Sequence, residues 1–371
     1  MNTFNFQIRP LDETQRILDQ TVATTLGRLA PLRAGRPTVV EGEFDLAWGE
    51  LVGLSLQEML VPEAAGGLGL GAVEAIATSY YSGSACSPFP LKEMIWAHGL
   101  CASGGAMSRS AHALSARSLA VSSPLRPTSR GLASSNDGVR TVASAVCPPG
   151  QPDQLLLICR DANDDRNFAI VVRLDSPGVS VIAQGTIDLR WRSIEVDLPR
   201  ELLDAHGVFV ASSAIDRYRQ LWSIMCAAEV LGAAHSALSM GLTHLHQRVQ
   251  FKQPIGSRQA LQHLVVDDHV LCENLMLAVE VAALAWDSGS EDEIEQAVAI
   301  AVLQARRARR VLENAIQFHG AMGFTCEIPL HHLMRRVIRL GSELWEAAEP
   351  SEVLGRGLSR VAQRHHACGA A

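Results

Sequence analysis

The sequence of 371 residues predicts a mostly α-helical protein with a central β-domain. Apolar residues recur at helical spacing in the first part of the chain and, over much longer stretches, in the last part. Between them lie short runs rich in β-branched residues, separated by Gly, Pro, Asp or Asn, which are typical of strands. The expected domains are an N-terminal helical domain over 1–118, a β-domain over 119–210 and a C-terminal helical bundle over 211–371.

The N-terminal domain should consist of helices joined by short loops. Residues 43–60, EFDLAWGELVGLSLQEML, place apolar side chains at helical spacing, and Pro62 with a glycine cluster ends this helix. The run GGLGLG, residues 66–71, is not a dinucleotide-binding fingerprint, because that fingerprint follows a strand and a helix precedes this run. We interpret it as a turn into the next helix.

Four short runs predict strands in the central domain: QLLLICRD, NFAIVVRLD, VSVIAQ and RSIEVDL. No long helices alternate with them. An antiparallel barrel or sandwich is therefore expected, in place of a Rossmann sheet.

The last part of the chain predicts a four-helix bundle. Residues 214–251 and 258–289 read as long helices. A third helix opens at Ser290, which with Glu293 fits a capping box, and Gly320 stops it. A shorter fourth helix follows, and antiparallel helices of this length form a bundle.

Composition excludes several function classes. The net charge of −7 and the absence of a long basic run argue against nucleic acid as a partner. The eight cysteines form no C-x-x-C pair, which is typical of reduced thiols in a cytoplasmic protein. The start of the chain has no apolar signal core, and the most apolar stretch contains Glu229 and His235, so no membrane span is expected.

The sequence also lacks the common signs of a metal site or a serine hydrolase. His244 and His246 are two residues apart, so they do not share a helix face, and convergent ligands are not apparent. No G-x-S-x-G turn occurs. We therefore expect no bound metal.

Two polar segments interrupt the helical pattern: RVQFKQPIGSRQALQH, residues 248–263, and QFHGAMGFTCEIPLHHLMRR, residues 317–336. They resemble the signature segments of the acyl-CoA dehydrogenase family, R-x-x-F-G-x-P-I with Q-x-x-Q-H, and Q-x-x-G-G-x-G-[YF]-x-x-E-x-P. Residues 54–75, LSLQEMLVPEAAGGLGLGAVEA, resemble a third family segment. The domain order also matches, so the resemblance implies the acyl-CoA dehydrogenase fold.

This resemblance implies an FAD flavoprotein that acts as an oligomer. In the family, the first segment's Arg and Phe reach the FAD of a neighbouring subunit, and the Gln-x-x-Gly segment holds its adenosine and pyrophosphate end. A guanidinium can grip a pyrophosphate with two hydrogen bonds, and glycines let the backbone approach it closely. The implied cofactor-binding residues are Arg248, Phe251, Gln259, Gln317, Gly320 and Gly323.

Other family features are missing. Where the family has Thr-Glu-Pro-Gly-x-Gly-Ser-Asp and Trp-Ile-Thr-Asn-Gly beside the flavin ring, this chain has LAVSSPLRPTSRG and ASAVCPPGQ. Lys252 stands where the family usually has Gly, and Arg258 where an aromatic residue is common. The adenosine-side motifs are therefore retained, while the ring-side motifs are not.

The position of a catalytic base is unsettled by the sequence. The family reaction needs a carboxylate beside the substrate α-carbon. An ungapped count from Arg335 places Leu344 at the usual family position, and a shift of two residues places Glu346 there. Glu343 and Glu349 are alternatives. The other family position falls near Trp222, which is no carboxylate.

The resemblance thus implies a subunit of an FAD-dependent acyl-CoA dehydrogenase, which introduces an α,β double bond into an acyl-CoA thioester. The chain resembles the non-base-carrying subunit of heteromeric members that act on bulky or steroid acyl-CoAs. A homo- or heterotetramer, α2β2 among the possibilities, and an electron-transfer flavoprotein as acceptor are expected. A homo-oligomer with altered chemistry and a flavin-free structural partner of the same fold remain open.

Overall fold

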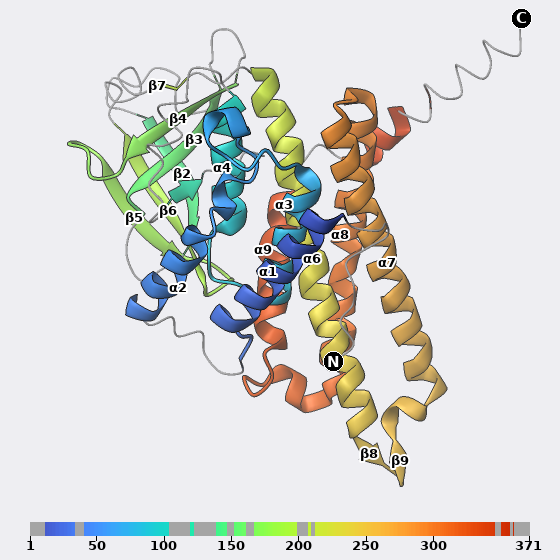
Figure 1. The fold of residues 1–371 in the computed structure, drawn as a ribbon. Coiled ribbons are helices and arrows are strands. Elements are labelled where there is room, and N and C mark those ends of the chain that lie inside the picture. The colour runs from blue at the N-terminus through green and yellow to red at the C-terminus, as the bar shows by residue number, and fades with distance from the viewer. Residues whose placement is uncertain are drawn as a thin grey trace, which may run out of the picture.

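The computed structural model describes residues 12–33, 41–103, 119–121, 139–146, 152–160, 167–198, 207–208, 212–345, 350–356 and 359. Figure 1 shows a helical bundle along one side of the molecule, a sheet on the other, and the N-terminal helices beside both. The predicted order of helical, strand and helical regions is confirmed.

Among its described residues the N-terminal domain contains four helices: α1 (Glu13–Leu29), α2 (Glu41–Gly53), α3 (Ala72–Ser84) and α4 (Leu91–Ser103). Short 3₁₀ turns follow α2: η1 (Leu56–Glu58) and η2 (Glu63–Ala65). The prediction of one helix over 43–60 is wrong, because Ser55 has a φ of 54°, which breaks the helix. The glycine run is a turn, as predicted: a Cβ on Gly67 would lie 2.3 Å from the Val61 carbonyl oxygen.

The central domain is a seven-stranded sheet in the order β5-β6-β2-β1-β3-β4-β7. The four predicted runs correspond to four of its strands. The pairs are antiparallel except β1 with β3. The strands are β1 (Leu119–Val121), β2 (Val139–Val146), β3 (Gln154–Arg160), β4 (Asn167–Arg173), β5 (Ser180–Gly185), β6 (Trp191–Leu198) and β7 (Gly207–Val208).

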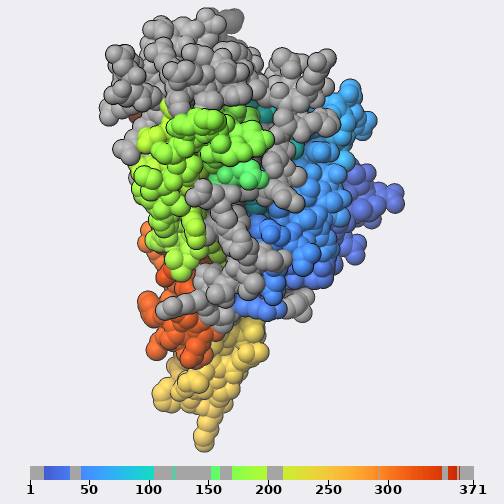
Figure 2. Space-filling model, turned by 90° about the vertical axis from the view of Figure 1, so that its left-hand side faces the viewer, coloured from blue at the N-terminus to red at the C-terminus, as the bar shows by residue number. Residues whose placement is uncertain are grey.

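The C-terminal domain is the predicted four-helix bundle. Its helices are α6 (Ser212–Gln247), α7 (Gln259–Ser288), α8 (Glu291–His319) and α9 (Leu330–Trp345). A small hairpin, β8 (Val249–Gln250) with β9 (Gln253–Pro254), and the turn η4 (Ile255–Ser257) join α6 to α7, and η5 (Gly320–Phe324) follows α8. Figure 2 shows the hairpin end projecting from the rest of the molecule.

One detail of the bundle prediction is wrong. Ser290 is the N-cap residue of α8, but its side chain makes no capping hydrogen bond. No backbone N–H of the first turn is therefore satisfied by the Ser290 hydroxyl, and the predicted capping box is not formed.

Helix α6 is the central element of the core. Glycines let α3 approach it closely: a Cβ on Gly83 would lie 1.9 Å from the Glu229 carbonyl oxygen, and one on Gly232 would lie 1.9 Å from that of Tyr80. Both α6 and α7 are long and apolar enough to cross a membrane by composition. The apolar window of α6 is 94% buried inside the protein, which identifies it as a core helix, whereas that of α7 is 56% buried.

Candidate functional site

The first polar segment forms a tight hairpin at the end of α6. The Arg248 N–H still donates to the His244 carbonyl (2.9 Å), and the chain then reverses with Val249 opposite Pro254. The two turn residues, Phe251 and Lys252, have φ values of 54° and 66°. Positive φ at both central positions is the geometry of a type I′ hairpin turn, which favours Gly.

The hairpin presents its side chains to solvent. The Phe251 ring is 82% exposed, and the Arg258 guanidinium lies over it, 5.4 Å from the ring centroid. Arg258 therefore stacks on this ring at the position where the family often has an aromatic residue. Arg248 and Gln259 are also exposed, and neither side chain makes a hydrogen bond within the described part of the chain.

The second polar segment closes α8 with a glycine turn. The Gly320 N–H donates to the Gln317 carbonyl, and Gly320 has a φ of 59°. A Cβ on Gly323 would lie 2.3 Å from the Ile316 carbonyl oxygen, so a side chain cannot fit there. Phe324, the next residue, is 81% exposed.

The fold brings the two segments to the same end of the bundle (Figure 1). The His244 and His319 rings contact each other with centroids 4.4 Å apart and planes tilted by 30°. His244 lies one helical turn before Arg248, and His319 directly precedes Gly320. Burial lowers the pKa of His244, and the neighbouring His319 and Arg248 lower it further. These exposed donors, glycines and aromatic rings form the candidate cofactor end of the molecule.

The structure describes only some of the candidate catalytic bases. Glu346 and Glu349 lie outside the described residues. Leu344, at the ungapped family position, is fully buried. Glu343 is next to both family positions. It directly precedes Leu344 in the chain, and its Oε2 accepts a hydrogen bond of 3.2 Å from Nε1 of Trp222. Its other oxygen, Oε1, is 2.5 Å from Arg339 Nη1, so both oxygens are engaged.

Glu343 belongs to a buried ionic cluster that joins all three domains. Lys92 and Glu93 come from α4, and Asp188 and Arg190 from the β5–β6 connection. The bundle contributes one carboxylate from α6, two guanidinium groups from α9, and Glu343. The cluster comprises four basic and four acidic side chains: Lys92, Arg190, Arg336, Arg339, Glu93, Asp188, Glu229 and Glu343.

Arg336 lies at the centre of this cluster and is 1% exposed. Its Nε is 2.5 Å from Asp188 Oδ2, its Nη1 is 2.6 Å from Glu229 Oε1, and its Nη2 donates to the Ser87 carbonyl (2.8 Å). Burial opposes ionisation of Asp188, but Arg336 and Arg339 hold its pKa below the ordinary value.

Lys92 forms the second centre. Its Nζ is 3.4 Å from Glu93 Oε1, 3.6 Å from Glu229 Oε2, and 4.3 Å from the centroid of the Trp222 ring. Burial opposes the charge on Lys92, yet the acidic neighbours raise its pKa above the ordinary value. Burial also raises the pKa of the adjacent Cys226 thiol, which stays neutral, so the carboxylates supply the attraction.

The cluster therefore occupies the region around both family base positions, and no carboxylate described there is free to face a substrate. Sequence reasoning missed it. Two signals were present: the Lys92–Glu93 pair within an otherwise apolar helix, and Glu229 within the most apolar stretch of the chain. A buried charge needs a partner of opposite charge, so each of these two signals implied further charged residues in the core.

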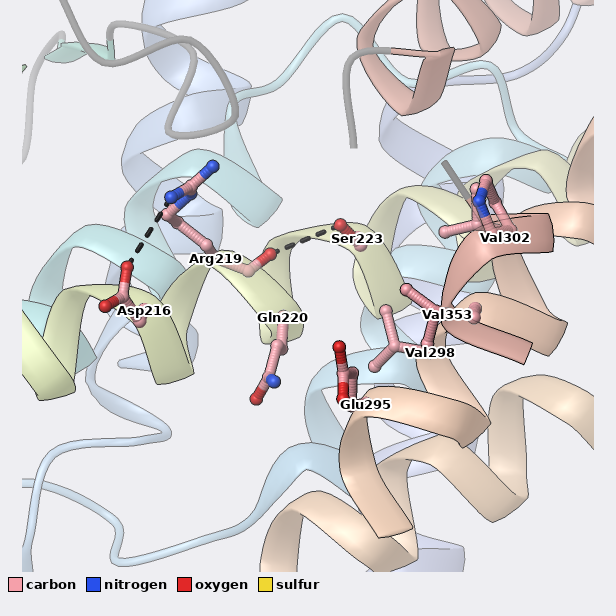
Figure 3. Close-up of a pocket in the computed structure, with 10 residues that line it drawn as sticks. Asp216, Arg219, Gln220, Ser223, Glu295, Val298, Val302 and Val353 are labelled. Atoms are coloured by element: carbon pink, nitrogen blue, oxygen red, sulfur yellow. Dashed lines mark hydrogen bonds and ion pairs between the residues drawn. The ribbon is translucent and has the colours of Figure 1, made fainter. Parts of the chain in front are cut away.

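Two cavities lie at the opposite end of the bundle. One of about 230 Å³ lies between α6, α8 and residues 350–356 (Figure 3). Asp216, Arg219 and Glu295 are among its polar lining residues, and Val298 and Val302 are among its apolar ones. A neighbouring cavity of about 810 Å³ shares Asp216 and Glu295. None of the predicted site residues that the structure describes lines either one, and the described residues contain no cluster suited to a metal ion.

The domain order and the two bundle segments define the acyl-CoA dehydrogenase class of fold. Solved structures agree. The chain superimposes on the ChsE4-ChsE5 complex from Mycobacterium tuberculosis with a TM-score of 0.75 and 21% identity, covering 94% of this chain and 98% of that one. Butyryl-CoA dehydrogenase from Megasphaera elsdenii gives 0.73 and 18%, covering 95% and 100%.

The sequence comparisons point to the same family. Residues 206–340 match the model of the acyl-CoA dehydrogenase C-terminal domain. It is 27% identical over 177 residues to acryloyl-CoA reductase (NADH) of Anaerotignum propionicum, which is 45% of this chain and 44% of that protein. It is 30% identical over 176 residues to the acyl-CoA dehydrogenase FadE34 of Mycobacterium tuberculosis, 47% and 24% respectively. The matched segments thus cover less than half of the length of each of these two relatives.

Proposed function

We propose that the chain is the cofactor-completing, non-base-carrying subunit of a heteromeric FAD-dependent acyl-CoA dehydrogenase. One observation carries this proposal. The cofactor end of the bundle presents exposed and unpaired polar groups, whereas the region of the family base is filled by a buried ionic cluster. A chain of this kind can grip a cofactor but cannot abstract a substrate proton by itself.

The residues at the cofactor end fit one end of FAD. Arg248 would bind the pyrophosphate, since its guanidinium is exposed and has no partner within the described residues. Phe251 and its stacked Arg258 offer a flat surface to an aromatic ring. Gln317, Gly320 and Gly323 would let the backbone and an amide side chain approach the adenosine end. Bound FAD would supply hydride acceptance.

The base and the flavin-ring pocket must then come from a second chain of the same fold. The structural neighbours support this reading, because the ChsE4-ChsE5 complex and the Tcur3481-Tcur3483 steroid ACAD each pair two chains. We propose an α2β2 heterotetramer acting on a bulky or steroid acyl-CoA, with an electron-transfer flavoprotein as electron acceptor. A structure that contains such a flavoprotein is also among the neighbours.

The test is to purify the chain with and without the product of the neighbouring gene. Bound FAD is measured by its absorbance, and dye reduction is measured with a panel of acyl-CoAs. We expect little flavin and no turnover from the chain alone, and a yellow, active complex with the partner. A single-chain preparation with bound flavin and full turnover contradicts the proposal.

A matched pair of variants tests the cofactor end in that complex. Arg248→Met should lower FAD retention at least tenfold, because one charge-assisted contact is worth about 1.5–3 kcal/mol. Arg309→Met, which removes an exposed arginine paired with Glu313 on α8, should leave retention unchanged. Equal retention in both variants contradicts the assignment of Arg248.

Two other functions make different predictions for the same preparation. A homo-oligomer with altered chemistry would bind flavin as a single chain. A structural partner of the same fold would contain no flavin even in the complex. The flavin spectrum of the two preparations separates the three.

A further inference from the structure

The buried ionic cluster contains hydrogen-bond donors that its own acceptors do not satisfy. Arg339 is 8% exposed, and its Nη1 donates to Glu343. Its Nη2 has no hydrogen-bond partner within the described part of the chain, and its Nε lies 3.6 Å from Asp188 Oδ2 without forming a hydrogen bond. By contrast, Arg336 donates from all three of its guanidinium nitrogens. The unsatisfied donors therefore lie on the Arg339 side of the cluster.

Trp191, the first residue of β6, adds another unsatisfied donor beside Arg339. It is 4% exposed, and the Arg339 guanidinium lies over its ring, with Cζ 4.1 Å from the centroid. The indole Nε1 has no hydrogen-bond partner among the described residues. Nε of Arg190, the preceding residue, is a further buried donor of this kind. A buried donor without an acceptor is costly, so a group outside the chain is expected to supply one.

The missing partner has to be an acceptor, because the unsatisfied atoms of Arg190, Trp191 and Arg339 are all nitrogen donors. No carboxylate oxygen of the cluster is both buried and unsatisfied among the described atoms. A water molecule would accept, but it would also bring two O–H groups that need acceptors of their own. An anion brings none, so it fits this set of donors better.

The charge of the cluster leaves room for one negative ion. Its four basic and four acidic side chains would balance if all of them were ionised. Burial, opposed by the attraction of Lys92, raises the pKa of Glu93 and so favours its neutral carboxyl form. With Glu93 neutral, the cluster carries one net positive charge, which a monovalent anion would compensate.

We propose that a small monovalent anion, of the size of chloride, binds between Trp191 of the β-domain and Arg339 of α9. It accepts hydrogen bonds from the indole N–H and from Nη2 of Arg339. Neither of the two cavities described above is lined by these residues, so a single ion suits the space better than a phosphate or a coenzyme. Because the two residues belong to different domains, the ion ties the β-domain to the bundle. The inference needs no flavin and does not rest on the proposed function.

Urea unfolding of the purified protein tests the site, with chloride at about 0.15 M exchanged for gluconate at the same ionic strength. A ligand that binds only the folded chain raises the folded-to-unfolded ratio, and we expect a gain of about tenfold in chloride. Trp191→Phe keeps the ring under Arg339 but removes the N–H, so this variant should show no gain. In gluconate it should be at least as stable as wild type, because it has one unsatisfied donor fewer.

Trp286→Phe is the matched control. Trp286 is also buried, but its Nε1 donates to the Arg217 carbonyl (3.0 Å). This variant should be less stable than wild type in both salts and keep the chloride gain. Crystals soaked in bromide give a direct readout, an anomalous peak beside Trp191 Nε1 and Arg339 Nη2. The inference is overturned if wild type unfolds alike in both salts, if Trp191→Phe keeps the chloride gain, or if only a water molecule occupies that position.

Discussion

Asp268 is a buried carboxyl group on α7 with one unsatisfied oxygen. Its Oδ1 accepts a hydrogen bond of 2.8 Å from Asn314 Nδ2, whereas Oδ2 has no hydrogen-bond partner within the described part of the chain. Burial raises the pKa of Asp268 to about 6, against a smaller opposing effect of Asn314. The folded chain therefore holds this proton more tightly than the unfolded chain, in which the pKa of an Asp is about 4.

This pKa gives a pH dependence of stability with a definite sign. The stabilising contribution of protonated Asp268 is fully present below the unfolded pKa and is lost as the pH rises through about 6. We expect Asp268→Asn to have a free energy of unfolding about 2 kcal/mol above wild type at pH 8, and to converge with it near pH 4. Urea unfolding at the two pH values measures this.

The exposed neighbour provides the control. Asp267→Asn, which removes a carboxylate 3.9 Å from Arg310, should follow the wild-type pH profile. An Asp268→Asn variant no more stable than wild type at pH 8 would contradict the prediction.

At the scale of elements, the β8–β9 hairpin is built on a turn that its sequence does not favour. Lys252 has a φ of 66°, a left-handed conformation that costs a non-glycine residue about 1 kcal/mol. Lys252→Gly should therefore stabilise the hairpin by about that amount. The expected result is several-fold slower hydrogen exchange of the Ile255 N–H, which donates to the Arg248 carbonyl across the hairpin.

Lys252→Ala separates backbone relief from loss of the lysine charge. Because alanine keeps the Cβ, this variant should show no slowing of exchange at Ile255. If the alanine and glycine variants protect the hairpin equally, the strain at residue 252 is not the cause.

Much of the element structure could be predicted from the sequence, because helical periodicity and turn residues are local signals. Helices α6, α7 and α8 lie where the pattern of apolar residues places them, except that α6 ends at Gln247 and the last residues predicted for it, 249–251, belong to the β8–β9 hairpin. The extent of α2 was mispredicted, because apolar spacing continues through Ser55, while the left-handed conformation of that residue is not marked by a glycine. Periodicity alone does not detect such a break.

At the scale of the whole molecule, the two halves of the candidate site differ in how far the sequence could predict them. The cofactor end consists of two contiguous segments, so each could be recognised along the chain. The ionic cluster forms only when α4, the β5–β6 connection, α6 and α9 dock against one another. Residues as far apart in the sequence as Asp188 and Arg336 leave no local pattern that shows their pairing. A charged residue in an apolar segment indicates only that a partner is needed and does not identify that partner.

The same cluster should determine how strongly the three domains are held together. Arg336→Met leaves Asp188 and Glu229 without their main partner, and breaking a buried ion pair from one side costs about 3–5 kcal/mol. Adding Glu229→Gln should recover part of this loss, because Asp188 keeps Arg339 at 3.6 Å. Urea unfolding measures both. Arg335→Met, at the half-buried neighbour, is the control and should cost less than about 1 kcal/mol. If Arg336→Met costs no more than Arg335→Met, the domains are held together by apolar packing and not by the ionic cluster.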